Sequence, residues 1–318
     1  MTQWQKTLVQ YLACRAKLLV ADSDEITDIM QTEQGSLPVV EACSRLRRRL
    51  QEHDMQPVRG RLDVLELGVE RLAAREITVR VKVREWHMYA WEERTGEQEK
   101  VRDARITLIC QEDGSWGVAA DEVVRVLPSR EIEELPVAWT SEEEERAVAE
   151  KPSQTYVYDR IAAVRYAELW WNSYNPAYRH FDDDCTNYIS QCLHAGGIPM
   201  KSTGNRATGW WYRGGNSPGA VWSYSWAVAN SFRWMLERGN PIYTEKKESP
   251  YELTIGDIIC YDFEGDGRWN HSTIIVAKDF FGSPLVNAHT VNSRLRYWDY
   301  TDSTAYTKDI KYSFYHIL

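Results

Sequence analysis

The chain has 318 residues with 38 basic and 47 acidic side chains, so its formal charge is −9. This acidic balance argues against a general nucleic-acid-binding protein, which needs a basic surface for phosphate contacts. A hydrophobic content of 43% and a charged content of 27% exclude a disordered or collagen-like chain. No apolar run approaches the roughly 18 residues that a membrane span needs, so we expect no membrane span.

The amino-terminal segment lacks the pattern of a signal peptide. Lys6, Arg15 and Lys17 interrupt its apolar residues, and no small-residue cleavage site follows. This predicts a cytoplasmic protein, with a cell-wall or spore location reached by a non-classical route as the alternative. The six cysteines include no C-x-x-C pair, which argues against a disulfide framework and a structural zinc site.

Aromatic and charged residues divide the chain into two parts. Of the 38 aromatic residues, 31 follow position 150, whereas the whole net charge precedes position 151. The composition changes at a run of four glutamates beginning at Glu142. We therefore predict an amino-terminal domain over 1–140, an acidic linker over 141–154 and a second domain over 155–318.

The first part combines helical and strand patterns. Apolar residues spaced by three and four predict one helix around Leu8 and another around Leu46. Alternating apolar residues then predict an antiparallel meander, with strands at 62–70, 76–91, 100–111 and 115–126. His53 and His87 are isolated, and we interpret each as a surface or interface residue. No catalytic pattern appears, which favours a docking or regulatory role.

The second part places helices before strands, as in an α+β domain. Helices are predicted over 159–173, 185–195 and 223–237, followed by strands over 255–261, 271–277, 284–289 and 312–317. Gly196-Gly197 ends the second helix with the usual carboxyl-terminal glycine signal. The whole chain is thus predicted to be α+β in class.

Cys185 stands at the start of the second predicted helix, directly after three aspartates. Unpaired backbone N–H groups and the positive helix end lower the pKa of a thiol there. The aspartates oppose this effect, so a neighbouring imidazolium is needed to offset them. By itself this segment also fits a buried structural cysteine.

Two histidines strengthen the catalytic interpretation. His271 opens one predicted strand and His289 closes the next, so antiparallel pairing would bring them together. Asn287 lies two residues before His289, on the same strand face. A cysteine, a histidine and a polar orienting residue form the arrangement that activates a thiol nucleophile.

Several separated motifs occur in one order along the second part: Trp170–Pro176, Asp184–Leu193, Ser223–Trp226, Gly256–Ile258, Tyr261–Ser272 and His289–Thr290. Over residues 155–318 the chain resembles the putative amidase domain family, which is related to NlpC-like and CHAP cell-wall hydrolases of papain-like fold. The resemblance implies a carboxyl-terminal papain-like cysteine hydrolase domain, with helices packed on an antiparallel sheet. The smaller α+β domain of helices and an antiparallel meander precedes it.

The resemblance also implies the chemistry. It implies hydrolysis of an amide bond in a peptide or a peptidoglycan stem, without a cofactor. Cys185 would be the nucleophile, His271 the general base and His289 the orienting residue, with Asn287 as the alternative. The N–H of Cys185 would supply one oxyanion donor. Asp184 would receive a substrate amine, as similar aspartates do in NlpC-like peptidases.

Other interpretations stay open at this point. Asp262, Glu264 and Asp266, followed by Gly267, resemble the start of a calcium loop, but Thr273 stands where its bidentate glutamate belongs. A polar hairpin without metal is the preferred reading. A catalytically silent relative that binds cell-wall peptide or protein, or an acyltransferase that uses the same cysteine, would share these residues.

Overall fold

The chain folds into two compact units. The computed structural model describes residues 1–20, 31–32, 35–124 and 156–318. Unit 1 comprises Met1–Arg125 with Val291–Tyr306, and unit 2 comprises Val126–Thr290 with Thr307–Leu318. The expected acidic linker at 141–154 lies outside the described residues. The expected domain over 155–318 differs from unit 2, because a segment near its carboxyl end joins unit 1.

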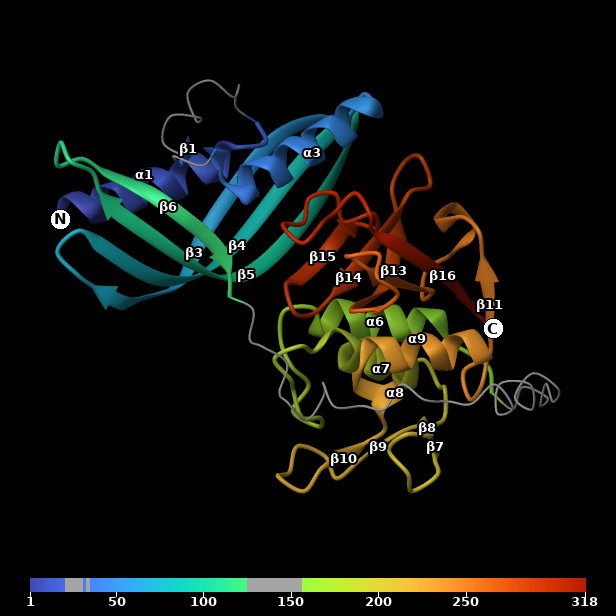
Figure 1. Cartoon of the computed structure of the whole chain (residues 1–318). Helices are drawn as coiled ribbons and strands as arrows, with labels where there is room; N and C mark the ends of the chain where they lie inside the picture. The colour runs from blue at the N-terminus through green and yellow to red at the C-terminus, as the bar shows by residue number, and fades with distance from the viewer. Residues whose placement is uncertain (21–30, 33–34, 125–155) are drawn as a thin grey trace. The chain divides into compact units, whose positions relative to one another are not determined.

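Within the residues that the structure describes, unit 1 contains two helices and an antiparallel sheet (Figure 1). Its elements are α1 (Gln3–Lys17), β1 (Gln31–Thr32), β2 (Gly35–Ser36), α3 (Pro38–Glu52), β3 (Gln56–Leu72), β4 (Glu76–Trp91), β5 (Arg94–Cys110), β6 (Trp116–Val123) and β15 (Asn292–Tyr297). β3, β4 and β5 follow one another in the sheet, and β5 also pairs with both β6 and β15. The expected meander is therefore present.

The core of unit 1 lies between its helices and the sheet. In α1, Leu8, Tyr11 and Leu12 are buried at the three- and four-residue spacing that marks one helix face. They belong to one apolar cluster with inward-facing residues of β4 such as Val79 and Val81. A capping box between Thr2 and Gln5 begins α1.

The segment over 291–306 joins unit 1 through strand pairing and ion pairs. In β15, Asn292 pairs with Val101 of β5. Arg49 of α3 forms an ion pair of 2.8 Å with Asp299. Strand hydrogen bonds and charge pairing thus hold a late part of the sequence in the amino-terminal unit, which sequence reasoning did not anticipate.

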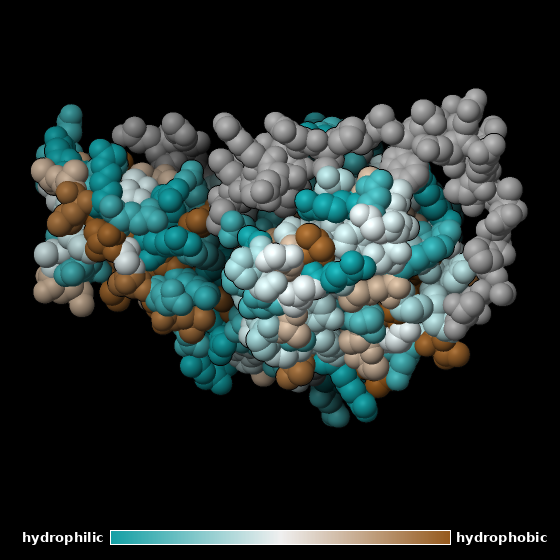
Figure 2. All heavy atoms as spheres, turned by 90° about the horizontal axis from the view of Figure 1, so that it is seen from below, coloured by the Kyte–Doolittle hydropathy of each residue, from teal (hydrophilic) through white to brown (hydrophobic). Residues whose placement is uncertain are grey.

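His87 is buried in unit 1, whereas the sequence predicted a surface or interface residue. It lies on β4 with only 6% of its surface exposed, and this burial lowers its pKa to about 3. By contrast, β3 leaves apolar side chains in solvent, including Leu67 at 57% and Leu72 at 71% exposure. Figure 2 shows apolar side chains gathered at the surface of unit 1.

Unit 2 places helices against one face of an antiparallel sheet (Figure 1). The helices are α6 (Arg160–Trp170), α7 (Cys185–Ala195), α8 (Tyr224–Ala227), α9 (Ala229–Arg238) and the short η1 (Pro250–Glu252). The sheet runs in the order β11 (Thr244–Lys247), β16 (Lys311–Ile317), β12 (Ile258–Asp262), β13 (His271–Lys278) and β14 (Pro284–Ala288). Two small hairpins complete it: β7 (Lys201–Ser202) with β8 (Gly209–Trp210), and β9 (Tyr212–Arg213) with β10 (Val221–Trp222).

The structure confirms the expected mixture of helices and antiparallel strands. The helix predicted over 185–195 is α7, and β13 begins at His271 as expected. The helix predicted over 223–237 is divided into α8 and α9, because Val228 adopts an extended backbone conformation. In the described part of the chain, no helix is long and apolar enough to cross a membrane.

Candidate active site

Cys185 is the first residue of α7, and Asp184 fixes the turn that precedes it. The Asp184 carboxylate accepts hydrogen bonds from the backbone N–H of Phe181 and from Nδ2 of Asn187, both at 2.8 Å. The first nine residues of α7 are buried, so the helix is held firmly in unit 2. The helix start that the sequence predicted for Cys185 is confirmed.

The thiol of Cys185 lies between α7 and the beginning of β13. Its Sγ is 3.7 Å from Oγ1 of Thr186 and accepts a hydrogen bond from the backbone N–H of Ser272. Burial, together with the negative charge of Asp183, raises the pKa of the thiol to about 11. In this state Cys185 is therefore a neutral thiol at pH 7.

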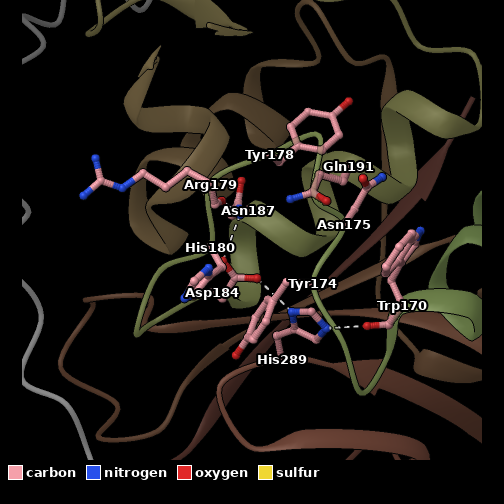
Figure 3. Close-up of a pocket in the computed structure, with 10 residues that line it drawn as sticks. All are labelled: Trp170, Tyr174, Asn175, Tyr178, Arg179, His180, Asp184, Asn187, Gln191 and His289. Atoms are coloured by element: carbon pink, nitrogen blue, oxygen red, sulfur yellow. Dashed lines mark hydrogen bonds and ion pairs between the residues drawn. The ribbon is translucent and has the colours of Figure 1, made fainter. Parts of the chain in front are cut away.

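His289 lies against the same helix start and is bonded at both ring nitrogens (Figure 3). Nδ1 is 2.8 Å from Oδ2 of Asp184, and Nε2 is 2.8 Å from the carbonyl oxygen of Trp170. Both ring nitrogens therefore lie within hydrogen-bond distance of an oxygen acceptor, which fixes the orientation of the ring. The ring also stacks on Tyr188 at 4.0 Å between centroids.

His271 opens β13, but its ring lies away from the α7 side of the sheet. It pairs with Tyr261 across the strands, and its ring packs 5.6 Å from Tyr261 and 5.9 Å from Phe263. The next residue, Ser272, faces α7, with Oγ 3.5 Å from Oγ1 of Thr186. Successive side chains of a strand alternate between faces, which separates the His271 side chain from that of Ser272.

The predicted orienting residues therefore have other partners. We expected His289 or Asn287 to hold His271, but both nitrogens of His289 are occupied by Asp184 and Trp170. Nδ2 of Asn287 donates to Glu168 of α6 at 2.7 Å. The physical reason is the strand face: both residues belong to the side that packs on the helices, where acceptors are close.

Asp184 also differs from its expected role. We expected its carboxylate to receive a substrate amine, but it is buried and bonded to Phe181, Asn187 and His289. It fixes the turn directly before the nucleophile candidate. The Oδ1 of Asn187 in turn accepts Nε1–H of Trp226 at 2.8 Å, so the network extends to α8.

In the segment that resembles a calcium loop, the acidic side chains accept hydrogen bonds from other residues of the same segment. The carboxylate of Asp262 accepts the backbone N–H groups of Gly265 and Gly267, each at 2.8 Å. Asp266 accepts the N–H of Arg268, and Glu264 accepts Nδ2 of Asn270. Among the described residues, no group of three or more His, Cys, Asp or Glu side chains is arranged to hold a metal ion.

Sequence reasoning missed the aromatic residues that enclose His289. Tyr174 meets its ring edge at 5.2 Å, and Tyr188 covers its face. The hollow beside these rings, seen in Figure 3, has no room for a water molecule. Tyr188 follows Cys185 by almost one helical turn, a spacing that signals a shared helix face, but only the fold shows which histidine it covers.

The arrangement defines an α/β domain with a cysteine at a helix start beside a histidine-bearing antiparallel sheet. A model of the putative amidase domain family matches residues 157–315. The chain belongs to this putative amidase domain family.

Two proteins of Bacillus subtilis (strain 168) are similar to this chain. The uncharacterized protein YhbB is 52% identical over 183 residues, which cover 57% of this chain and 56% of YhbB. The uncharacterized protein YjcM is 26% identical over 130 residues, which cover 38% of this chain and 28% of YjcM. The similarity thus spans little more than half of YhbB and about a quarter of YjcM.

Proposed function

We propose that this chain hydrolyses an amide bond, with Cys185 as the nucleophile and His271 as its general base. Family membership supports the amidase reaction. The observation that carries the choice of residues is the hydrogen bond from the Ser272 N–H to the Cys185 sulfur. It places the backbone next to His271 in direct contact with the thiol.

His271 is a better candidate base than His289. Both nitrogens of His289 are already engaged, by Asp184 and by the carbonyl of Trp170, so one of these contacts must break before that ring can take the thiol proton. His289 and Asp184 act instead as positioning residues that hold the start of α7. The ring of His271 borders Tyr261 and Phe263, and its backbone directly precedes the residue that contacts the sulfur.

The proposed reaction starts from the neutral thiol. Because burial raises the pKa of Cys185 to about 11, the base removes the thiol proton as Sγ attacks the amide carbon. The N–H of Cys185, at the helix start, stabilises the oxyanion. The imidazolium of His271 then protonates the leaving amine, and water hydrolyses the thioester to free Cys185.

The proposed substrate is a peptide or a peptidoglycan stem. The helix that begins at Cys185 packs against an antiparallel sheet, and this arrangement, together with the motif order over 155–318, supports the choice. Trp210 and Trp226 are buried, so they support the fold and leave sugar stacking to other residues.

The test is incubation of the full chain with peptidoglycan fragments and with peptides, followed by mass analysis of the products. Wild-type protein should cleave an amide bond, and a thioester mass should accumulate on Cys185. Cys185→Ala and His271→Gln should both abolish turnover. Cys192→Ala is the matched control, because Cys192 is buried on the same helix and should retain activity.

Four outcomes would contradict the proposal. Full activity of Cys185→Ala would exclude the nucleophile, and full activity of His271→Gln with an inactive His289→Gln would transfer the base role. Products in which an added amine replaces water would identify an acyltransferase. Saturable binding of fragments with neither cleavage nor a thioester would identify a silent binding module.

A further inference from the structure

Unit 1 buries a cluster of charged side chains between its helices and its sheet. Arg15 of α1 contacts Asp121 at 3.0 Å and also pairs with Glu85 of β4. Arg102 of β5 contacts Asp121 at 2.6 Å. The side chains of these four residues are at most 10% exposed. The cluster is thus removed from water, where charged groups need close partners.

Tyr11 and Cys43 adjoin the cluster without adding charge. The Tyr11 hydroxyl donates to Asp121, and burial raises the pKa of this phenol well above its usual value. Burial also raises the pKa of the Cys43 thiol. Both groups are therefore neutral at pH 7, and neither supplies an anion to the arginines.

A cavity of about 50 Å³ opens beside these charges. A single water needs roughly 10–15 Å³ on this measure, so the cavity has room for a small molecule. Its charged lining consists of Arg15, Lys100, Arg102, Arg296, Glu85 and Asp302. Its apolar lining comes from Val39, Ala42, Cys43, Val123 and Val291, and Ser303 and Thr304 complete it. The lining therefore combines four cationic side chains and two carboxylates with a set of apolar side chains.

Three donors of the lining arginines have no hydrogen-bond acceptor within the described residues. They are Nε and Nη1 of Arg102 and Nε of Arg15, in side chains that are 6% and 2% exposed. A buried donor without an acceptor is unfavourable. A molecule in the cavity that brings carboxylate oxygens would satisfy such donors, because guanidinium and carboxylate groups match in geometry.

We propose that this cavity binds a small monocarboxylate of two to four carbon atoms. The carboxylate faces Arg102 and Arg15, and the short alkyl group faces Val39, Ala42 and Cys43. Glu85 and Asp302 on the same lining disfavour a multiply charged anion such as phosphate. The cationic side chains disfavour a cation, and the cavity volume limits the ligand to a few heavy atoms.

The test is calorimetric titration of the full chain, in a buffer free of carboxylates, with acetate, propionate and butyrate. Sodium chloride and inorganic phosphate serve as comparison anions. At least one monocarboxylate should bind saturably, one molecule per chain, and more tightly than either comparison anion. Tighter binding of phosphate or chloride, or no binding of any monocarboxylate, would overturn the proposal.

Two variants locate the site. Arg102→Gln removes the central donor, and Ala42→Leu enlarges an apolar lining residue while leaving every charge in place. Each should weaken carboxylate binding by about tenfold or more. Arg80→Gln is the matched control, because Arg80 lies on β4 with its side chain 49% exposed, and it should bind like wild type. If Arg102→Gln does not fold, unchanged binding by Ala42→Leu alone refutes the site.

Discussion

The two units bury charge in different ways. In unit 2, both oxygens of Asp184 and both nitrogens of His289 have partners, and the neighbouring hollow has no room for water. In unit 1, Arg102 keeps donors without an acceptor among the described residues, beside a cavity of about 50 Å³. A fully bonded network holds a helix start in place, whereas donors left over beside a cavity are suited to bind a ligand.

The largest effect is expected at the thiol of unit 2. Cys185→Ala should lower amide hydrolysis by about 10³-fold or more, because a nucleophile and its base act as a unit. Its thermal stability should stay close to that of wild type, since one sulfur atom is removed. Steady-state kinetics and calorimetry on the same preparation measure both quantities. A stable Cys185→Ala variant with undiminished turnover would show that Cys185 is not the nucleophile.

The buried charges of unit 1 should give the largest effect on stability. Asp121→Asn leaves Arg15 and Arg102 with an uncompensated charge, so we expect a loss of about 3–5 kcal/mol in the free energy of unfolding. Asp103→Asn is the control, because Asp103 pairs with the exposed Arg80 and should cost about 1 kcal/mol or less. Urea titration measures both. Equal losses would show that burial does not distinguish the two pairs.

A change in the hydrogen-bond network around Asp184 and His289 in unit 2 should cost less stability than the change at Asp121. Asp184→Asn keeps the side-chain shape but replaces the charged acceptor of His289, so we expect a loss of about 1.5–3 kcal/mol. The contact between Nδ1 of His289 and residue 184 should weaken, which the imidazole NMR signals report. Unchanged imidazole signals and unchanged stability in this variant would contradict a stabilising bond between Asp184 and His289.

The smallest effect concerns acid stability of unit 1. His87 has a pKa of about 3 in the folded chain and about 6.5 in an unfolded chain. The contribution of neutral His87 to the free energy of unfolding is fully present above pH 6.5. It is lost as the pH falls toward 3, because His87 takes up its proton in the unfolded chain at a higher pH than in the folded chain. Between pH 7 and pH 5 the loss should be about 2 kcal/mol.

His87→Gln should remove this acid sensitivity without a matching change in unit 2. Urea titrations at pH 7 and pH 5 compare the variant with wild type. His53→Gln is the control, because His53 ends α3 and is only partly buried. Equal pH dependence of wild type and His87→Gln would show that His87 is not the sensitive group.

Local patterns in the sequence determined the elements that carry the candidate site. The apolar spacing and the glycines that follow Ala195 were enough to predict α7, and Cys185 at its start followed directly. The strand that begins at His271 was equally clear, because apolar residues follow it without interruption. Such signals depend on neighbouring residues alone, and they are fixed by helix and strand geometry.

Tertiary structure decided which of these elements contact one another. No local pattern indicated that the segment over 291–306 belongs to unit 1, since the pairing of Asn292 with Val101 joins residues far apart in the chain. Sequence reasoning also placed His289 near His271, whereas the fold bonds His289 to Asp184. Strand register and the face that each side chain occupies depend on long-range packing, and no local pattern specifies them.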